Sequence, residues 1–327
     1  MKAVITENLT KIYPGGIKAV DNVCISLEPG EVFGFLGPNG AGKTTTVKLL
    51  GGMLTPTGGT CRVFDIDPSA KPEQIHGFCG VVTEHAQMYD NMTGFSNLVF
   101  YGTVFGMSAA ESQTRALSLL DRLDLMDAKD RKLGAYSTGM RQRLSLARAM
   151  IHGPKMLFLD EPTAGLDPES VQSVNNMIKS LAETEGTTIF LCTHQLRYAQ
   201  EICSSYGLID NGVLLAAGSI EHLRSLIFPG LTVSIEADGL DNDSLKTDAG
   251  FTRNSDLPML VTKTGQRRYE INVKSEDDTP IIIRSIVESG GSVYNVSARR
   301  ISLEEIYFAL LEKRKEGSGQ NQNNCEL

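Results

Sequence analysis

The chain has 327 residues, 41% hydrophobic and 21% charged, which are ordinary globular values and, at this length, favour two domains. Its formal net charge is -8 and its isoelectric point is near 5.3. Proteins that bind nucleic acid usually carry a basic patch, so the acidic balance argues against that partner. Because no run approaches the roughly 18 apolar residues of a membrane-spanning helix, we expect any role at a membrane to be played from outside the hydrocarbon.

Three short apolar runs predict strands of a largely parallel sheet. They are EVFGFL at 31–36, KMLFL at 155–159 and TIFLC at 188–192, and each is followed by glycines or polar residues. Apolar residues recur at helical spacing over 170–183, and another helix is expected from about Lys43. Strands joined by right-handed helical crossovers form a sheet that binds ligands at the carboxyl ends of its strands, where these polar residues lie.

Further along the chain, helix formers over about 86–135 predict an inserted helical region, and Asn211-Gly212 predicts the turn of a hairpin over 206–217. Past Phe228 the pattern changes to a small α+β domain. Its predicted elements are strands at 232–237, 268–273 and 292–297, a loop at 240–258, a helix at 280–289, and a helix opened by a capping box of Ser302 and Glu305. The polar tail at 315–327 is expected to be disordered.

Residues 37–44 read GPNGAGKT, a complete phosphate-loop motif between a strand and a helix. Glycines let the backbone N–H groups wrap phosphates at a helix N-terminus, which favours anions. Lys43 is predicted to reach the β- and γ-phosphates of ATP, and Thr44 to bind Mg²⁺. The predicted nucleotide-binding residues here are Gly37, Pro38, Asn39, Gly40, Ala41, Gly42, Lys43, Thr44 and Thr45.

The run MLFLDEP at 156–162 ends a strand in two carboxylates. Asp160 is predicted to join Thr44 at Mg²⁺, as in P-loop NTPases. Glu161 is predicted to be the general base or to orient the attacking water. A surface Asp-Glu pair after a strand is common by itself, but the phosphate loop upstream favours the catalytic interpretation.

The remaining motifs follow in a family order. After the phosphate loop come STGMRQR at 137–143, LDEP at 159–162, GLDP at 165–168 and the pair Thr193-His194. With this order and spacing the chain resembles an ABC ATPase over residues 1–225, with a helical subdomain at about 86–152. The resemblance implies an α/β P-loop NTPase core with antiparallel β and helical subdomains, to which residues 226–314 add a small C-terminal α+β domain.

The resemblance also implies roles for single residues. Tyr13 would stack on adenine, and His194 would touch the γ-phosphate beside the catalytic Lys43 and Glu161. Ser137 and Gly139 would contact the γ-phosphate on an opposite subunit, and Asp167 would lie in the loop that crosses the dimer interface. One chain carries one phosphate loop and one signature segment (137–143), so a head-to-tail dimer with a second ABC ATPase is implied, either a copy or a paralogue.

Two positions depart from the family pattern. The signature segment has Thr138 and Met140 where the family usually has glycine and glutamine. Glu84 aligns where the family usually has a glutamine that binds Mg²⁺ or its water, and Gln87 is a competing candidate. Glutamine both donates and accepts hydrogen bonds, whereas an ionised glutamate only accepts. Glu84 is still predicted to bind Mg²⁺ or its water, but it adds negative charge beside ATP.

The resemblance therefore implies an ATP-hydrolysing transporter subunit, peripheral on the cytoplasmic face of the membrane and coupled to a separate integral membrane permease. Glu84 and the small terminal domain resemble exporter-type members that carry drugs or lipids. Three alternatives stay open: an importer subunit, a soluble ABC ATPase of DNA repair or translation, and a catalytically inactive regulatory module. The intact catalytic residues argue against the last, and no nucleic acid partner is expected.

Overall fold

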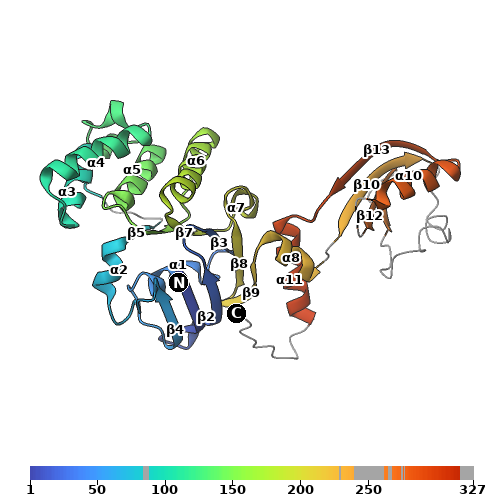
Figure 1. The fold of residues 1–327 in the computed structure, drawn as a ribbon, viewed down its shortest axis with the longest axis horizontal. Helices are drawn as coiled ribbons and strands as arrows, with labels where there is room; N and C mark the ends of the chain where they lie inside the picture. Colours follow the sequence, from blue (N-terminus) through green and yellow to red (C-terminus); the bar gives the residue numbers. More distant parts are fainter. Residues whose placement is uncertain are drawn as a thin grey trace. The chain divides into compact units, whose positions relative to one another are not determined.

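The computed structural model describes residues 1–83, 88–227, 230–238, 261–263, 267–273, 275 and 277–316. The chain divides into two compact units, one of residues 1–219 with 313–327 and one of residues 220–312 (Figure 1). Across the described residues, no helix is both long enough and apolar enough to cross a bilayer.

A six-stranded sheet forms the centre of the first unit, in the order β5-β6-β7-β3-β8-β9. Its strands are β3 (Val32–Leu36), β5 (Cys79–Val82), β6 (Met156–Asp160), β7 (Thr188–Thr193), β8 (Ser205–Asp210) and β9 (Val213–Gly218). All neighbours are parallel except β8 and β9, whose turn residues Asn211 and Gly212 both have positive φ, as a tight hairpin turn requires. Strands β3, β6 and β7 therefore end at the same edge of the sheet.

Both faces of this sheet are apolar because each is covered by another layer. On one face, Phe158 of β6 and Phe190 of β7 pack in a core that includes α1 (Lys43–Leu50). Their strand neighbours Leu157 and Ile189 point to the other face, as the two-residue period of a strand dictates. The helices over that face are α5 (Thr138–Met150), α6 (Pro168–Glu185) and α7 (Leu196–Ile202) (Figure 1).

Two additions complete the first unit. An antiparallel sheet in the order β2-β1-β4 closes the core on the α1 side; its strands are β1 (Val4–Tyr13), β2 (Ile17–Leu27) and β4 (Gly58–Val63). The helical region contains α3 (Gly94–Val104), α4 (Ala109–Arg122), α5 and two short 3₁₀ turns at Met126–Ala128 and Leu133–Ala135. Helix α2 (Pro72–Phe78) lies outside this region and precedes β5. Thr93 caps α3, and Ser108 forms a capping box with Glu111 at α4, so each helix starts where its sequence provides a cap.

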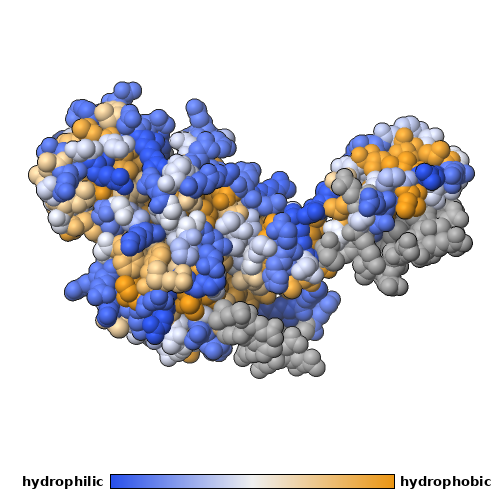
Figure 2. Space-filling model, viewed as in Figure 1, coloured by the Kyte–Doolittle hydropathy of each residue, from blue (hydrophilic) through white to orange (hydrophobic). Residues whose placement is uncertain are grey.

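The second unit is an antiparallel sheet in the order β11-β12-β10-β13 with a helix on one face. Its elements are α8 (Ile220–Ile227), β10 (Leu231–Asp238), β11 (Val261–Lys263), β12 (Arg268–Val273), α10 (Asp278–Glu288), β13 (Ser292–Arg299) and α11 (Leu303–Glu316) as far as residue 312. Ile235 and Ile271 pack against Ile282 of α10. Figure 2 shows a hydrophobic area on this unit. Two apolar side chains of α10, Ile281 and Val287, are exposed.

Several predictions fall on residues outside this description. They are the assignments of Glu84 and Gln87, the whole of the loop at 240–258 and most of the tail at 315–327. The first unit ends at Ser219, while the sequence places the domain boundary at 225, and α8 occupies the difference.

Candidate active site

The phosphate loop joins β3 to α1, and its shape requires glycine at two positions. Gly42 has a φ of 109°, and a Cβ there would lie 2.2 Å from the carbonyl oxygen of Ala19. At Gly37 a Cβ would lie 2.1 Å from the carbonyl oxygen of Ile209. No side chain fits either place. The first turn of α1 has no side-chain cap and no acidic residue, so its backbone N–H groups favour an anion.

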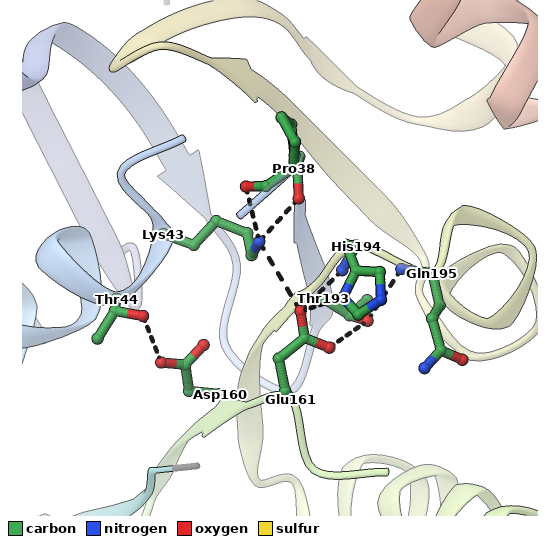
Figure 3. A network of polar contacts seen from close by, with 9 residues as sticks. Pro38, Lys43, Thr44, Asp160, Glu161, Thr193, His194 and Gln195 are labelled. Atoms are coloured by element: carbon green, nitrogen blue, oxygen red, sulfur yellow. Dashed lines mark hydrogen bonds and ion pairs between the residues drawn. The ribbon is translucent and has the colours of Figure 1, made fainter. Parts of the chain in front are cut away.

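Lys43, the first residue of α1, is a buried cation that folds back over this loop. Its ammonium donates to the carbonyl oxygens of Gly37 at 2.7 Å and Pro38 at 3.1 Å, and lies 3.8 Å from Glu161 Oε1 (Figure 3). A buried charge needs such partners. The positive charge therefore sits where the sequence predicts the β- and γ-phosphates.

Thr44 and Asp160 meet at the carboxyl end of β6. The Thr44 hydroxyl donates to Asp160 Oδ2 at 2.6 Å (Figure 3), and β6 is buried along its whole length. Hydroxyl and carboxylate oxygens are hard ligands of the kind Mg²⁺ prefers, and protein sites for this ion often supply one or two carboxylates and leave the rest to water and phosphate. The hydroxyl of Thr44 and the carboxylate of Asp160 are donors of this kind, so the pair fits Mg²⁺.

Glu161 adopts a strained backbone conformation and is held by the end of β7. Its φ is 49°, which for a residue other than glycine costs about 1–3 kcal/mol. Thr193 Oγ1 donates to Oε2 at 2.9 Å, the backbone N–H of His194 donates to Oε1 at 3.0 Å, and His194 Nδ1 lies 2.7 Å from Oε1 (Figure 3). An ionised carboxylate can only accept, so the proton of this pair lies on Nδ1.

The Cys192 thiol on β7 is fully buried next to these carboxylates. Burial, and after it the charge of Asp160, raises the pKa of Cys192 well above its usual value. The thiol therefore stays protonated and is not a nucleophile.

The cavity enclosed by these groups has a volume of about 360 Å³, within the usual range of roughly 300–1,000 Å³ for small-molecule sites. Its lining residues are Ala19, Asn39, Gly40, Gly42, Lys43, Thr44, Thr45, Asp160 and Glu161. Most of the residues predicted from the two phosphate-site motifs thus surround a single space. A buried ammonium, open N–H groups and a hydroxyl–carboxylate pair suit a polyphosphate with Mg²⁺.

Tyr13 lies beside this site, at the end of β1. Its hydroxyl is 3.4 Å from Thr45 Oγ1, which places the tyrosine next to the first turn of α1. That position is compatible with the predicted contact to a nucleotide base.

Ser137, Gly139 and Asp167 gather at a second place. Ser137 caps α5 and Asp167 caps α6; a Cβ added at Gly139 would lie 3.6 Å from side-chain atoms of Leu166 and Ser170. The backbone N–H and hydroxyl of Ser170 bond to the Asp167 carboxylate and lower its pKa. None of the three predicted residues is among the described residues that line the 360 Å³ cavity.

Two features of the site could not be predicted from the sequence: one residue that lines the cavity and one hydrogen bond that holds Glu161. Ala19 lines the cavity from β2, which is distant along the chain and carries no motif, so nothing local could have identified it. Thr193 appeared as part of a Thr-His pair, but its hydrogen bond to Glu161 was not expected. A hydroxyl residue placed directly before a histidine at the end of a buried strand was the available signal.

Comparisons with known proteins agree with the family resemblance of the sequence. The sequence profile described as "ABC transporter" matches residues 20–164. The chain is 41% identical to the daunorubicin/doxorubicin resistance ATP-binding protein DrrA of Streptomyces peucetius over 319 residues, which cover 94% of this chain and 92% of that protein. It is 31% identical to the linearmycin resistance ATP-binding protein LnrL of Bacillus subtilis over 307 residues, covering 93% and 96%.

The fold has a counterpart among solved structures. A dimeric ATP-binding cassette in a post-hydrolysis state, bound to ADP and Pi, aligns with a TM-score of 0.62 and 25% identity, covering 66% of this chain and 98% of that chain. This likeness, together with the three sheets, confirms the predicted fold class of an α/β core with antiparallel and helical parts and a small C-terminal region.

Proposed function

Because this chain belongs to the ABC transporter family of ATP-binding proteins, we propose that it hydrolyses ATP to drive export through a separate membrane permease. The predicted family and ATPase class are confirmed by the same similarity. Relatives named for resistance to daunorubicin, doxorubicin and linearmycin favour an exporter of a toxic compound over an importer or an ATPase of DNA repair or translation. The observation that carries the proposal is the convergence of Lys43, the Thr44–Asp160 pair and Glu161 on one cavity.

Nucleotide binding is proposed to rest on Lys43 and the N-terminus of α1. The ammonium is bonded to two carbonyl oxygens of its own loop, and charged phosphate oxygens are stronger acceptors than these neutral ones. The Lys43 ammonium would therefore donate to the triphosphate in place of these carbonyl oxygens, and its ion pair with Glu161 would break. Thr44 and Asp160 would hold Mg²⁺, which when bound neutralises charge on the phosphate oxygens.

Hydrolysis is proposed to use Glu161 as the general base. The carboxylate takes a proton from a water whose oxygen attacks the γ-phosphorus, and ADP leaves. Thr193 and His194 hold this carboxylate in place. Since Nδ1 of His194 donates to Glu161, Nε2 can donate to a phosphate oxygen only when both ring nitrogens carry a proton.

A complete site is proposed to need a second ATPase, either a copy of this chain or a paralogue. In this dimer, Ser137 and Gly139 would contact the γ-phosphate bound by the opposite subunit, and Asp167 would lie at the interface. Their place outside the cavity of their own chain supports this arrangement. The dimer should be weak without nucleotide, because ATP supplies the contacts that favour closure.

The permease is proposed to dock on the exposed side of α3, which would hold the chain at the cytoplasmic face of the membrane. Phe105 and Val104, at the end of α3, are 41% and 62% exposed, and exposed apolar surface of this kind often marks an interface. Beside them lies a cavity of about 310 Å³ that is lined by Val81, Tyr101, Arg148 and His152 among others. A short apolar segment of the permease would fill it.

Glu161→Gln tests the catalytic assignment. The amide cannot accept the water proton, so we expect ATP binding to persist while hydrolysis falls by roughly 10²–10⁴-fold. Glu73→Gln on α2 is the control, since it removes an exposed carboxylate away from the cavity. Phosphate release and nucleotide affinity are measured on the purified full chain.

Two results would contradict the proposal at different levels. Wild-type turnover in Glu161→Gln would remove the general-base role and leave nucleotide binding intact. Unchanged ATP affinity in Lys43→Ala would count against the phosphate site itself, and therefore against the ATPase function.

A further inference from the structure

Thr163 and Tyr198 carry buried hydroxyl groups on the two chain segments that hold the catalytic pair. Thr163 lies in the loop just after Glu161, and Tyr198 lies in the first turn of α7, just after His194. The two residues are 3% and 7% exposed. Each segment thus carries one catalytic residue and one deeply buried hydroxyl.

Neither hydroxyl is satisfied in the arrangement described above. Thr163 Oγ1 and Tyr198 Oη are closed to solvent, and neither has a hydrogen-bond partner among the described residues. Most buried polar side-chain atoms in folded proteins do have a partner, because burial without one is unfavourable. Two such atoms on the segments of one catalytic pair therefore require an explanation.

The two side chains are close enough to affect one another. Burial raises the pKa of the Tyr198 phenol, and a weak hydrogen-bond interaction with the Thr163 side chain acts in the opposite direction. The two hydroxyls therefore lie near one another, although no hydrogen bond of good geometry joins them among the described residues. The charge of Glu161 also reaches this phenol. Tyr198 belongs to the same core cluster as Leu166, which follows Thr163 in the loop.

The backbone around Thr163 controls how Glu161 is presented. The N–H of Ala164 donates to the carbonyl of Glu161 at 3.1 Å, and the N–H of Leu166 donates to the carbonyl of Thr163 at 3.2 Å. These bonds form the tight turn in which Glu161 has its left-handed conformation. The position of Thr163 is therefore tied to the backbone of Glu161 through this turn.

We propose that Tyr198 is a positioning residue for ATP hydrolysis: when His194 is drawn to the γ-phosphate, the first turn of α7 approaches the turn after Glu161, and a hydrogen bond forms between Tyr198 Oη and Thr163 Oγ1. The bond fixes the segment of the general base against the segment of the histidine. Either hydroxyl can donate. The inference rests on the proposed ATPase mechanism and adds to it a link that no motif of the chain contains.

Tyr198→Phe and Thr163→Val test the link, because each removes one hydroxyl and keeps nearly the same volume. A neutral hydrogen bond that is realised in the transition state supports a fall in kcat of about 10-fold with the KM for ATP unchanged. The double variant should also lose about 10-fold, since either change alone removes the whole bond. Thr163→Ser keeps a hydroxyl and should keep the wild-type kcat.

Tyr206→Phe is the matched control. Tyr206 is a 2% exposed tyrosine of β8 whose hydroxyl donates to the carbonyl of Cys203 at 2.8 Å. This variant loses an existing hydrogen bond, so we expect a lower Tm and an unchanged kcat. Tyr198→Phe should show the reverse, a Tm at or above the wild-type value and a lower kcat, because its hydroxyl has no bond to lose among the described residues.

The outcomes separate the two proposals. A wild-type kcat in Tyr198→Phe, a double variant that loses about 100-fold, or a rise in KM that accounts for the whole loss would each overturn the positioning role and leave the ATPase proposal standing. A wild-type chain that hydrolyses no ATP would overturn both.

Discussion

Asp160 and Glu161 are adjacent carboxylates that contact different residues, and the φ angle of Glu161 makes this possible. Successive side chains of a strand point to opposite faces, so two extended residues would not face the same cavity. The positive φ of Glu161 breaks this alternation at the end of β6. Asp160 therefore meets Thr44 while Glu161 meets Thr193, and both carboxylates line the same space. The strained conformation places the proposed metal ligand and the proposed general base side by side.

Gly42→Ala tests the other strained position of the site. A Cβ at Gly42 meets both an unfavourable φ of 109° and the Ala19 carbonyl oxygen at 2.2 Å, so the loop must open. We expect a loss of at least about 1–3 kcal/mol in unfolding free energy and a loss of ATP binding. Gly153→Ala is the control, because its φ is 67° but nothing lies within 4 Å of the new Cβ. Normal nucleotide affinity in Gly42→Ala would refute the need for glycine.

Among the elements, those with a strong local pattern could be predicted from the sequence and those defined by long-range pairing could not. β3, β6 and β7 are short buried runs with polar residues at one end, and all three have the expected positions. The antiparallel sheet of β1, β2 and β4 was expected from the family resemblance alone. Register shifts between β1 and β2 interrupt the alternation that would have marked those strands.

The residues of the candidate site also fall into those that the sequence predicts and those that it does not. Lys43, Thr44, Asp160 and Glu161 belong to motifs whose spacing carries their chemistry, and the structure brings them together. Tyr198 belongs to no motif, because a tyrosine on the buried face of a helix looks like ordinary core. Its relation to the turn after Glu161 depends on how α7 packs, which no residue spacing encodes.

The N-terminus of α11 offers a test of how an element is capped. Sequence predicted the capping box of Ser302 and Glu305, and the structure adds Arg299, whose Nη1 donates to both Glu305 oxygens at 2.9 and 2.8 Å. Burial alone would raise the pKa of Glu305, but the hydrogen bonds from Ser302 and Arg299 outweigh it and lower the pKa. A lowered folded-state pKa means stability that is present above the unfolded pKa, near 4.5, and is lost as pH falls through the folded value.

Glu305→Gln should therefore weaken the pH dependence of unfolding of the second unit. Because the group is largely exposed and screened, we expect an effect of about 1 kcal/mol or less near neutral pH, vanishing below the folded pKa. Urea unfolding of the full chain is measured between pH 3 and 7, with Glu288→Gln, an exposed carboxylate at the end of α10, as the control. An identical pH profile in Glu305→Gln and the wild type would rule out this contribution.

At the scale of the whole molecule, the proposed chemistry and the proposed docking occupy separate cavities with no lining residue in common. The two are joined by the sheet. Val81 of β5 lines the docking cavity and pairs with Phe158 of β6, the strand that ends in Asp160. This strand pairing is a direct structural link between the cavity proposed for docking and Asp160, the proposed Mg²⁺ ligand.

Phe105→Asp should separate the two functions. The ring stacks on His152 at a centroid distance of 3.9 Å and is 41% exposed, so a carboxylate there places charge on the surface that the permease would cover. None of the described residues around the phosphate site touches it, so we expect normal ATP hydrolysis by the purified chain but loss of co-purification with membranes that contain the permease. Ile281→Asp, which charges a 53% exposed apolar residue of α10, is the matched control and should keep membrane association. If Phe105→Asp still sediments with the permease while Ile281→Asp does not, docking belongs to the second unit, and the role proposed for α3 is wrong.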